Sequence, residues 1–165
     1  MTLLRRAAAT VALAVSAATM PAPGAAAAPA NSSGPTTVPF KQDFRSCDFT
    51  RIGNVPISGN GKAIAVVRSA GSTATAQVQM FYGEPDTHYD VVLIEAPRPS
   101  AATCGPGDPG TAVAALNTDG AGAGTVTVQS GIRPGTTGVW LTIERPNEHS
   151  QAPVEFYSSD FIAPV

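Results

Sequence analysis

Short runs in which every second residue is apolar recur along most of the chain, separated by clusters of Gly, Pro, Asn and Asp. Between residues 73 and 82, one face of an extended chain would carry Ala74, Ala76, Val78, Met80 and Tyr82, and the other face Thr73, Thr75, Gln77, Gln79 and Phe81. A period of two is typical of half-buried strands, and no segment shows an apolar period of 3.6 over the length of a helix. Residues 91–94 are apolar on both faces, as in a central strand. The pattern predicts an all-β fold.

The strand-like runs are short and closely spaced. We expect strands over 43–52, 63–69, 73–82, 89–95, 111–118, 124–130, 138–144 and 154–162, with a long proline-rich loop over 97–110. Seven to eight such strands are the pattern of a β-sandwich or a small barrel. We favour a single antiparallel β-sandwich, immunoglobulin-like in the broad sense, over residues 43–165.

The first thirty residues have the composition of a signal peptide. Arg5 and Arg6 precede an apolar run over 7–20, which is shorter than the ~20 residues of a membrane span. The small residues Ala28 and Ala30 then flank a proline, in the small-x-small form that signal peptidase cleaves. We therefore expect residues 1–30 to be a signal peptide, with an N-terminal membrane anchor as the alternative. Residues 31–42 are rich in Ser, Thr and Pro and are expected to form a flexible leader.

Composition and charge exclude several classes of protein. The chain has 16 Gly and 15 Pro without a collagen repeat, and only 13% of its residues are charged. That is too much Gly and Pro for a helical bundle and too little charge for a charge-driven disordered chain. The net charge is −2, and loss of the two arginines of the signal peptide makes the mature chain more acidic. We expect no nucleic-acid partner and a secreted product, extracellular or associated with the cell envelope, without a transmembrane segment.

Two cysteines, Cys47 and Cys104, lie in the part of the chain expected to be exported. Outside the cytoplasm such a pair usually forms a disulfide, and closing a loop of this length stabilises a fold by roughly 4 kcal/mol in the chain-entropy model. The alternative, a metal-binding or catalytic pair, requires further ligands nearby, and neither cysteine has a CxxC spacing or an adjacent His.

Candidate catalytic residues are few, because His88 and His149 are the only histidines and no GxSxG motif is present. Glu84, Asp86, His88 and Asp90 lie close together in the sequence, and carboxylates around a His can bind a metal or transfer protons. The same four residues are also typical of a solvated loop and strand edge. We assign no catalytic, cofactor-binding or metal-binding residue and expect no cofactor.

Two aromatic residues fall on the polar side of their alternations. Trp140 has Val139, Leu141 and Ile143 on the opposite face, and Phe81 lies among Thr and Gln. Side chains in this position form a partner surface if they are exposed. We expect the alternative for Trp140, in which the leader, the 97–110 loop or a second sheet covers its ring.

The order of several features resembles that of small secreted β-sandwich proteins of actinobacteria, many of unassigned function. These features are the strand 89–93, Cys104 in a loop, and the strand 115–118 followed by Asp119, Gly120 and Gly124. The resemblance covers about residues 45–163. The layout also loosely resembles the copper/zinc superoxide dismutase sandwich, but that family requires more metal-binding histidines than the two present here.

Taken together, these features predict a secreted or envelope-associated, non-catalytic domain that acts as a binding or structural module. Its partner would be an unidentified protein or envelope component, and its oligomeric state is open. The alternative is an extracytoplasmic hydrolase or metal-dependent enzyme that uses Glu84, Asp86, His88 and Asp90. Fold class does not decide between them, because β-sandwiches host many functions.

Overall fold

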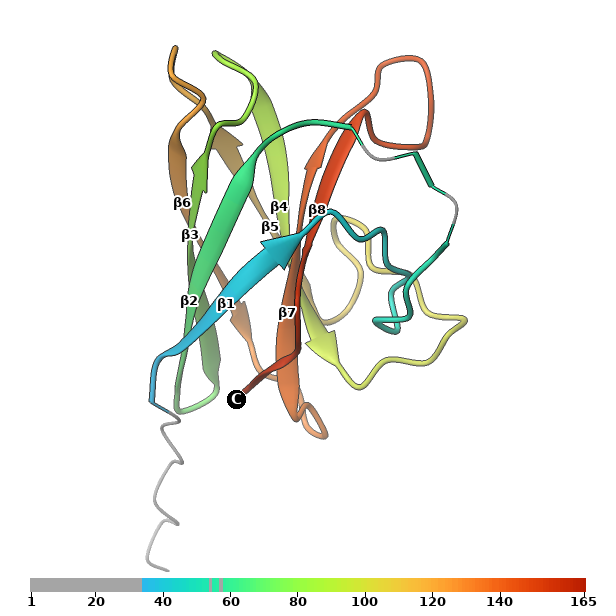
Figure 1. Cartoon of the computed structure of the whole chain (residues 1–165). Coiled ribbons are helices and arrows are strands. Elements are labelled where there is room, and N and C mark those ends of the chain that lie inside the picture. Colours follow the sequence, from blue (N-terminus) through green and yellow to red (C-terminus); the bar gives the residue numbers. More distant parts are fainter. Residues whose placement is uncertain (1–33, 54, 57) are drawn as a thin grey trace, which may run out of the picture.

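The computed structural model describes residues 34–53, 55–56 and 58–165 and contains nine β-strands (Figure 1). The strands are β1 (Thr36–Lys41), β2 (Lys62–Ala70), β3 (Thr73–Phe81), β4 (His88–Ala96), β5 (Thr111–Asn117), β6 (Gly124–Gly131), β7 (Gly138–Arg145), β8 (Glu155–Ser159) and β9 (Ala163–Pro164). All pairings are antiparallel. The prediction of an all-β antiparallel fold is confirmed.

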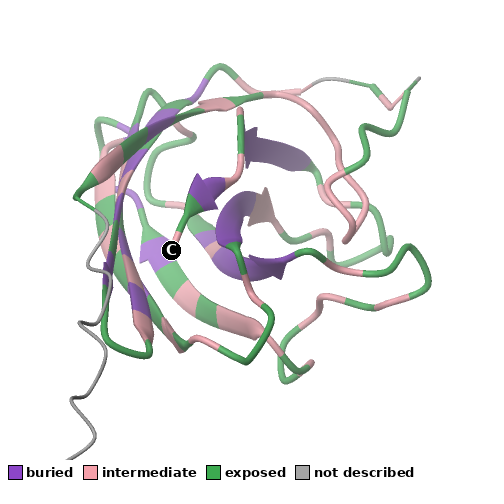
Figure 2. Ribbon diagram, turned by 90° about the horizontal axis from the view of Figure 1, so that it is seen from below, coloured by how far each residue is buried: buried purple, intermediate pink, exposed green. Residues whose placement is uncertain are grey.

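The strands form one hydrogen-bonded sheet in the order β5-β4-β7-β8-β1-β2-β3-β6, and β9 pairs with β7. β1 makes the sheet continuous, because its first four residues pair with β2 and its last two pair with β8. Seen along its axis, the sheet curls into a nearly closed, barrel-like ring (Figure 2). The expected division into two separate sheets, and with it the immunoglobulin-like class, is not confirmed.

The interior of the ring is filled by the apolar side chains that alternate along each strand. On β3, Ala74, Ala76, Val78 and Met80 are buried as the alternation predicts, whereas Tyr82 lies beyond the end of the strand and is exposed. Small residues on β2 and β3 face larger ones on β4 and β7, so the interior is packed rather than hollow.

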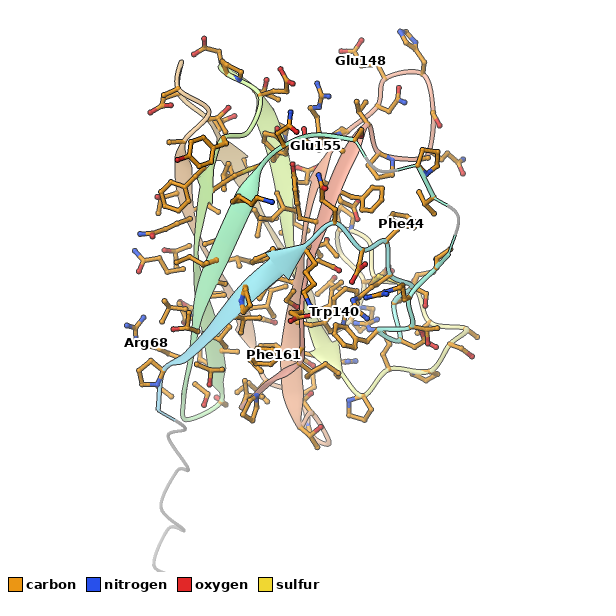
Figure 3. The ribbon with its side chains drawn as sticks, viewed as in Figure 1. Phe44, Arg68, Trp140, Glu148, Glu155 and Phe161 are labelled. Atoms are coloured by element: carbon orange, nitrogen blue, oxygen red, sulfur yellow. A yellow bond between two sulfur atoms is a disulfide. The ribbon has the colours of Figure 1, made fainter. Side chains whose placement is uncertain are left out.

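One end of the barrel is closed by a buried polar cluster around Glu155 (Figure 3). Tyr89 and Tyr157 each donate a phenolic hydrogen bond to its carboxylate, and Tyr157 also accepts one from the Gly61 backbone N–H at 2.8 Å. Arg145 approaches the same carboxylate at 3.5 Å. Burial raises the pKa of Tyr89 to about 12, and it raises the pKa of Tyr157 further. The buried charge is thus compensated by hydrogen bonds and one cation.

Two expectations about the N-terminal part need correction. Residues 36–41 belong to β1 rather than to a flexible leader, and only one of their side chains, that of Val38, is fully buried. Such a short strand between prolines leaves no alternation to detect. Residues 43–52 are not a strand: a single bridge joins Arg45 to Arg51, and the segment between them turns through Phe49. The Asp48 side chain accepts hydrogen bonds from Ser46 and Thr50, and this turn chemistry overrides the apolar pattern.

The proposed signal peptide, its cleavage site and the first residues of the leader lie outside the described residues. Within the described part of the chain, no helix has the length and apolar character needed to cross a membrane.

Candidate functional site

The outer face of β4, β5 and β7 forms the floor of a covered site. Three pairs across β4 and β7 lie in register on this face: Ile94 with Trp140, Val92 with Thr142, and Asp90 with Glu144. On β5, Val113 is paired with Val92. The floor therefore changes along the strands from apolar and aromatic, at Trp140, to acidic, at Asp90 and Glu144.

Two loops cover this floor, and a disulfide joins them. The 43–53 loop contributes Cys47 and the 97–110 loop contributes Cys104, with the Cα atoms 5.5 Å apart and no free cysteine among the described residues. The predicted Cys47–Cys104 bridge is confirmed. Both loops lie on the same side of the barrel in Figure 1, where they are teal and yellow.

An aromatic contact anchors the first loop to the floor. The Phe49 ring packs edge-on against Trp140 at a centroid distance of 5.2 Å, and the Arg45 guanidinium lies 3.9 Å from the Phe49 centroid. Arg45 also donates hydrogen bonds to Ser158 Oγ and to the Phe49 carbonyl. Phe49 has a φ of 71°, a left-handed conformation that costs of order 1–3 kcal/mol in a non-glycine residue. The contact with Trp140 and the bonds of Arg45 hold it in this conformation.

The second loop is held by its own hydrogen bonds. The Arg98 guanidinium donates to the carbonyls of Thr103 and Pro109, and Asp108 accepts from the Gly105 backbone N–H at 2.7 Å. Thr111 at the start of β5 donates to the Gly105 carbonyl at 2.9 Å. These hydrogen bonds tie the loop to itself and to the start of β5, although it contains no regular secondary structure.

A cavity of about 350 Å³ lies between the loops and the floor. It is lined by Arg45, Cys47, Asp90, Val92, Ile94, Ala102, Thr103, Cys104, Gly105, Pro106, Val113, Trp140, Thr142 and Glu144. A second cavity of about 210 Å³ adjoins it and is lined by Asp90, Glu144, Pro146, Asn147, Ser150, Gln151 and Pro153. Asp90 and Glu144, called here the carboxylate pair, line both cavities. The two cavities together form the candidate site.

Within the carboxylate pair, Glu144 lies in an unfavourable electrostatic environment. Burial raises the pKa of Glu144 above its ordinary value, and the neighbouring Asp90 charge raises it further. Asp90 accepts a hydrogen bond from His88 at 3.0 Å, but no ion pair of Glu144 is formed among the described residues. Glu144 is therefore a partly desolvated acid without a positive partner.

Trp140 supplies a second unsatisfied group. Its side chain is 1% exposed, and its indole Nε1–H has no acceptor among the described residues. A buried donor without a partner costs about 1–3 kcal/mol. Figure 3 shows Trp140 on the side of the barrel where the two loops lie.

The structure separates the four residues of the predicted acidic cluster. His88 and Asp90 are bonded to each other, and His88 also contacts Asn117 at 3.2 Å. Glu84 and Asp86 belong to the turn before β4, where their backbone groups bond to Tyr89, Thr118 and Asp119. Among the described residues, no group of three or more His, Cys, Asp or Glu side chains has a metal-binding arrangement. Of the cluster, only Asp90 lines the candidate site.

The two aromatic residues singled out from the sequence do not form one surface. Trp140 is buried under the loops, as expected, whereas Phe81 is 43% exposed on β3. β3 pairs with β2 and β6, and β7 pairs with β4, β8 and β9, so the two residues lie on strands that are not neighbours.

Sequence reasoning did not identify Glu144, Thr142 or Arg45 as site residues. A signal was present for the first two, because they share the parity of Trp140 in the alternation of 138–144. A segment that covers Trp140 must also cover part of the strand face that carries Thr142 and Glu144. No comparable signal exists for Arg45, which reaches the site only because the chain turns at Phe49.

Comparison with known proteins does not extend this description: no protein-family model, curated protein or solved structure matches the chain. The resemblance to small secreted actinobacterial proteins therefore rests on the sequence motifs alone.

Proposed function

We propose that this protein is an exported, non-catalytic binding domain that holds a small molecule, or a single side chain of a partner, in the cavity beneath its two disulfide-linked loops. The observation that carries the proposal is a preformed cavity of about 350 Å³ whose lining combines apolar residues, among them Val92, Ile94 and Trp140, with the carboxylate pair. Ligand sites in proteins typically have this composition.

Export is part of the proposal, and two features support it. The first thirty residues have the sequence pattern of a signal peptide, and the disulfide that frames the site is of a kind that forms and persists in oxidising compartments.

We also propose the finer fold assignment, an immunoglobulin-like sandwich. It is supported by the strand order, in which β1, β2, β3 and β6 are joined to β5, β4, β7 and β8 only through the two residue pairs between β1 and β8.

A matched pair of variants tests the site. Val113 and Ile64 are both β-branched strand residues, 38% and 39% exposed, but Val113 lines the cavity whereas Ile64 lies on β2 and lines neither cavity. Val113→Tyr narrows the cavity, and Ile64→Tyr places the same side chain elsewhere on the barrel. The oxidised protein and both variants are screened against amines, carboxylates, sugars and short peptides, with Trp140 fluorescence and thermal shift as readouts.

We expect at least one compound to bind to the wild type and to Ile64→Tyr but not to Val113→Tyr. Since Trp140 is the only tryptophan, its emission reports directly on the cavity. Equal binding by both variants, or no binding of any compound class, would contradict the proposal.

A hydrolase is the second candidate, and the carboxylate pair is the observation that favours it. Two adjacent carboxyl groups, one with a raised pKa, are the arrangement used for general acid–base catalysis. This candidate active site retains Asp90 of the predicted cluster and uses Glu144 in place of Glu84, Asp86 and His88. Turnover of chromogenic glycosides or esters that disappears in both Asp90→Asn and Glu144→Gln would favour the enzyme over the binding domain.

A further inference from the structure

We infer that the cavity selects a positively charged ligand, namely an organic ammonium group whose nitrogen lies against Asp90 and Glu144 and whose apolar part rests on the floor formed by Val92, Ile94 and Trp140. This inference rests on the proposed function, because it names the ligand class of the same cavity.

Glu144 forms no ion pair among the described residues, and the ion-pair contact of Asp90 there is with His88. Burying an acid is unfavourable unless it is paired, and two acids side by side add repulsion. Asp90 and Glu144 face each other across β4 and β7, so the Asp90 charge raises the energy of the charged form of Glu144. A cation bound between them removes both costs at once.

The positive groups near the pair are already engaged. Arg45 donates to Ser158 and to the Phe49 carbonyl, packs on the Phe49 ring, and lies 3.6 Å from the Asp43 carboxylate. His88 is bonded to both Asp90 and Asn117. No residue of the 97–110 loop or the 146–153 loop that lines either cavity carries a charge. The excess charge of the site is therefore negative.

The remaining walls define the rest of the ligand. Three apolar side chains and the disulfide lie on one side of the pair, so an uncharged hydrocarbon or aromatic group fits there. Trp140 lines the cavity on the same side and adds aromatic surface to this apolar wall. The second cavity, with Asn147, Ser150 and Gln151, leaves room for a polar extension beyond the ammonium group.

The test compares charged probes with neutral molecules of the same shape. Benzylammonium is compared with benzyl alcohol, and an acetyl-Gly-Lys-Gly amide is compared with its norleucine counterpart. The first pair represents a free amine and the second a lysine side chain of a partner. Calorimetry and Trp140 fluorescence are used with the wild type, Glu144→Gln, Asp90→Asn and the control Glu148→Gln, which removes an exposed acid that lines neither cavity.

We expect at least one charged probe to bind roughly tenfold or more tightly than its neutral counterpart, as a hydrogen bond to a charged group implies. Glu144→Gln and Asp90→Asn should remove this preference, and Glu148→Gln should keep it. Preference for benzylammonium alone assigns a free amine, and preference for the lysine peptide alone assigns a partner side chain.

Equal affinity for charged and neutral probes, or an unchanged preference in Glu144→Gln, overturns the inference. Binding that is confined to neutral or anionic compounds and abolished by Val113→Tyr also overturns it, while leaving the proposed binding function in place. If no compound of any class binds, the proposed function fails together with the inference.

Discussion

Replacing both Cys47 and Cys104 with Ala should lower the free energy of unfolding by about 4 kcal/mol. The two residues are 57 positions apart, and the chain-entropy expression for a loop of that length gives a loss of about 14 cal/mol/K, which is about 4 kcal/mol at about 25 °C. For a domain of this size the same loss lowers the unfolding midpoint by roughly 10–20 °C. Because small domains are stable by about 5–15 kcal/mol, the double variant should remain folded at room temperature.

Urea denaturation of the oxidised wild type and the double variant measures this difference. The m-value should rise in the variant, because the unfolded chain without the cross-link is more extended and exposes more surface. The wild type in the presence of a reductant provides the matched control and should behave like the variant, while the variant should be indifferent to reductant. A loss of less than about 1 kcal/mol with an unchanged m-value would refute the reasoning, because it would show that the bridge does not restrict the unfolded chain.

Three further predictions concern the burial of Trp140, the charge of Glu144 and export. Trp140→Ala should destabilise the fold by about 3–5 kcal/mol in urea denaturation, whereas Phe81→Ala, at a 43% exposed position, should cost under about 1 kcal/mol; equal losses would contradict the burial argument. Glu144→Gln should raise the thermal midpoint at neutral pH. The raised pKa in the folded state means that ionisation there is harder than in the unfolded chain, so this advantage should vanish as the pH falls below the ordinary glutamate pKa of 4.5. Mass spectrometry of exported protein should find an N-terminus between Ala26 and Asn31, and an intact initiator methionine would exclude the proposed processing.

The strands from residue 62 to residue 145 could be predicted from the sequence because each contains several alternations bounded by Gly, Pro or Asp. The buried row on β3 therefore matches the apolar parity of the sequence, whereas β7 is buried on both faces from Gly138 to Ile143. β1 could not be predicted, because Val38 is its one fully buried residue and Phe40 is the only other apolar side chain besides Pro39 in its six residues. The closure of the sheet could not be predicted from the sequence either, because it depends on the pairing of β1 with both β2 and β8, which are far apart in the chain.

The candidate site was only partly predictable, for a related physical reason. Alternation identifies the face of a strand that points into the core, but it does not say what covers the other face. The disulfide and the coverage of Trp140 could be predicted from compartment and residue type. The meeting of Asp90 with Glu144 depends on the register of β4 and β7, which the sequence of either strand alone does not contain.

The energetics of the site link its stability to its proposed use. The covered outer face holds three unfavourable features: the left-handed Phe49, the unpartnered Trp140 N–H and the uncompensated Glu144. Each is expected to lower stability, and none is required by the barrel, whose core lies on the opposite face of the same strands. The disulfide joins the two loops that cover this face, so its stabilisation opposes these costs. Under the proposed binding function, a ligand would supply the positive partner that Glu144 lacks among the described residues. It follows that Glu144→Gln should gain stability and lose ligand preference in the same molecule, whereas a purely structural role for Glu144 predicts that the substitution would not increase stability.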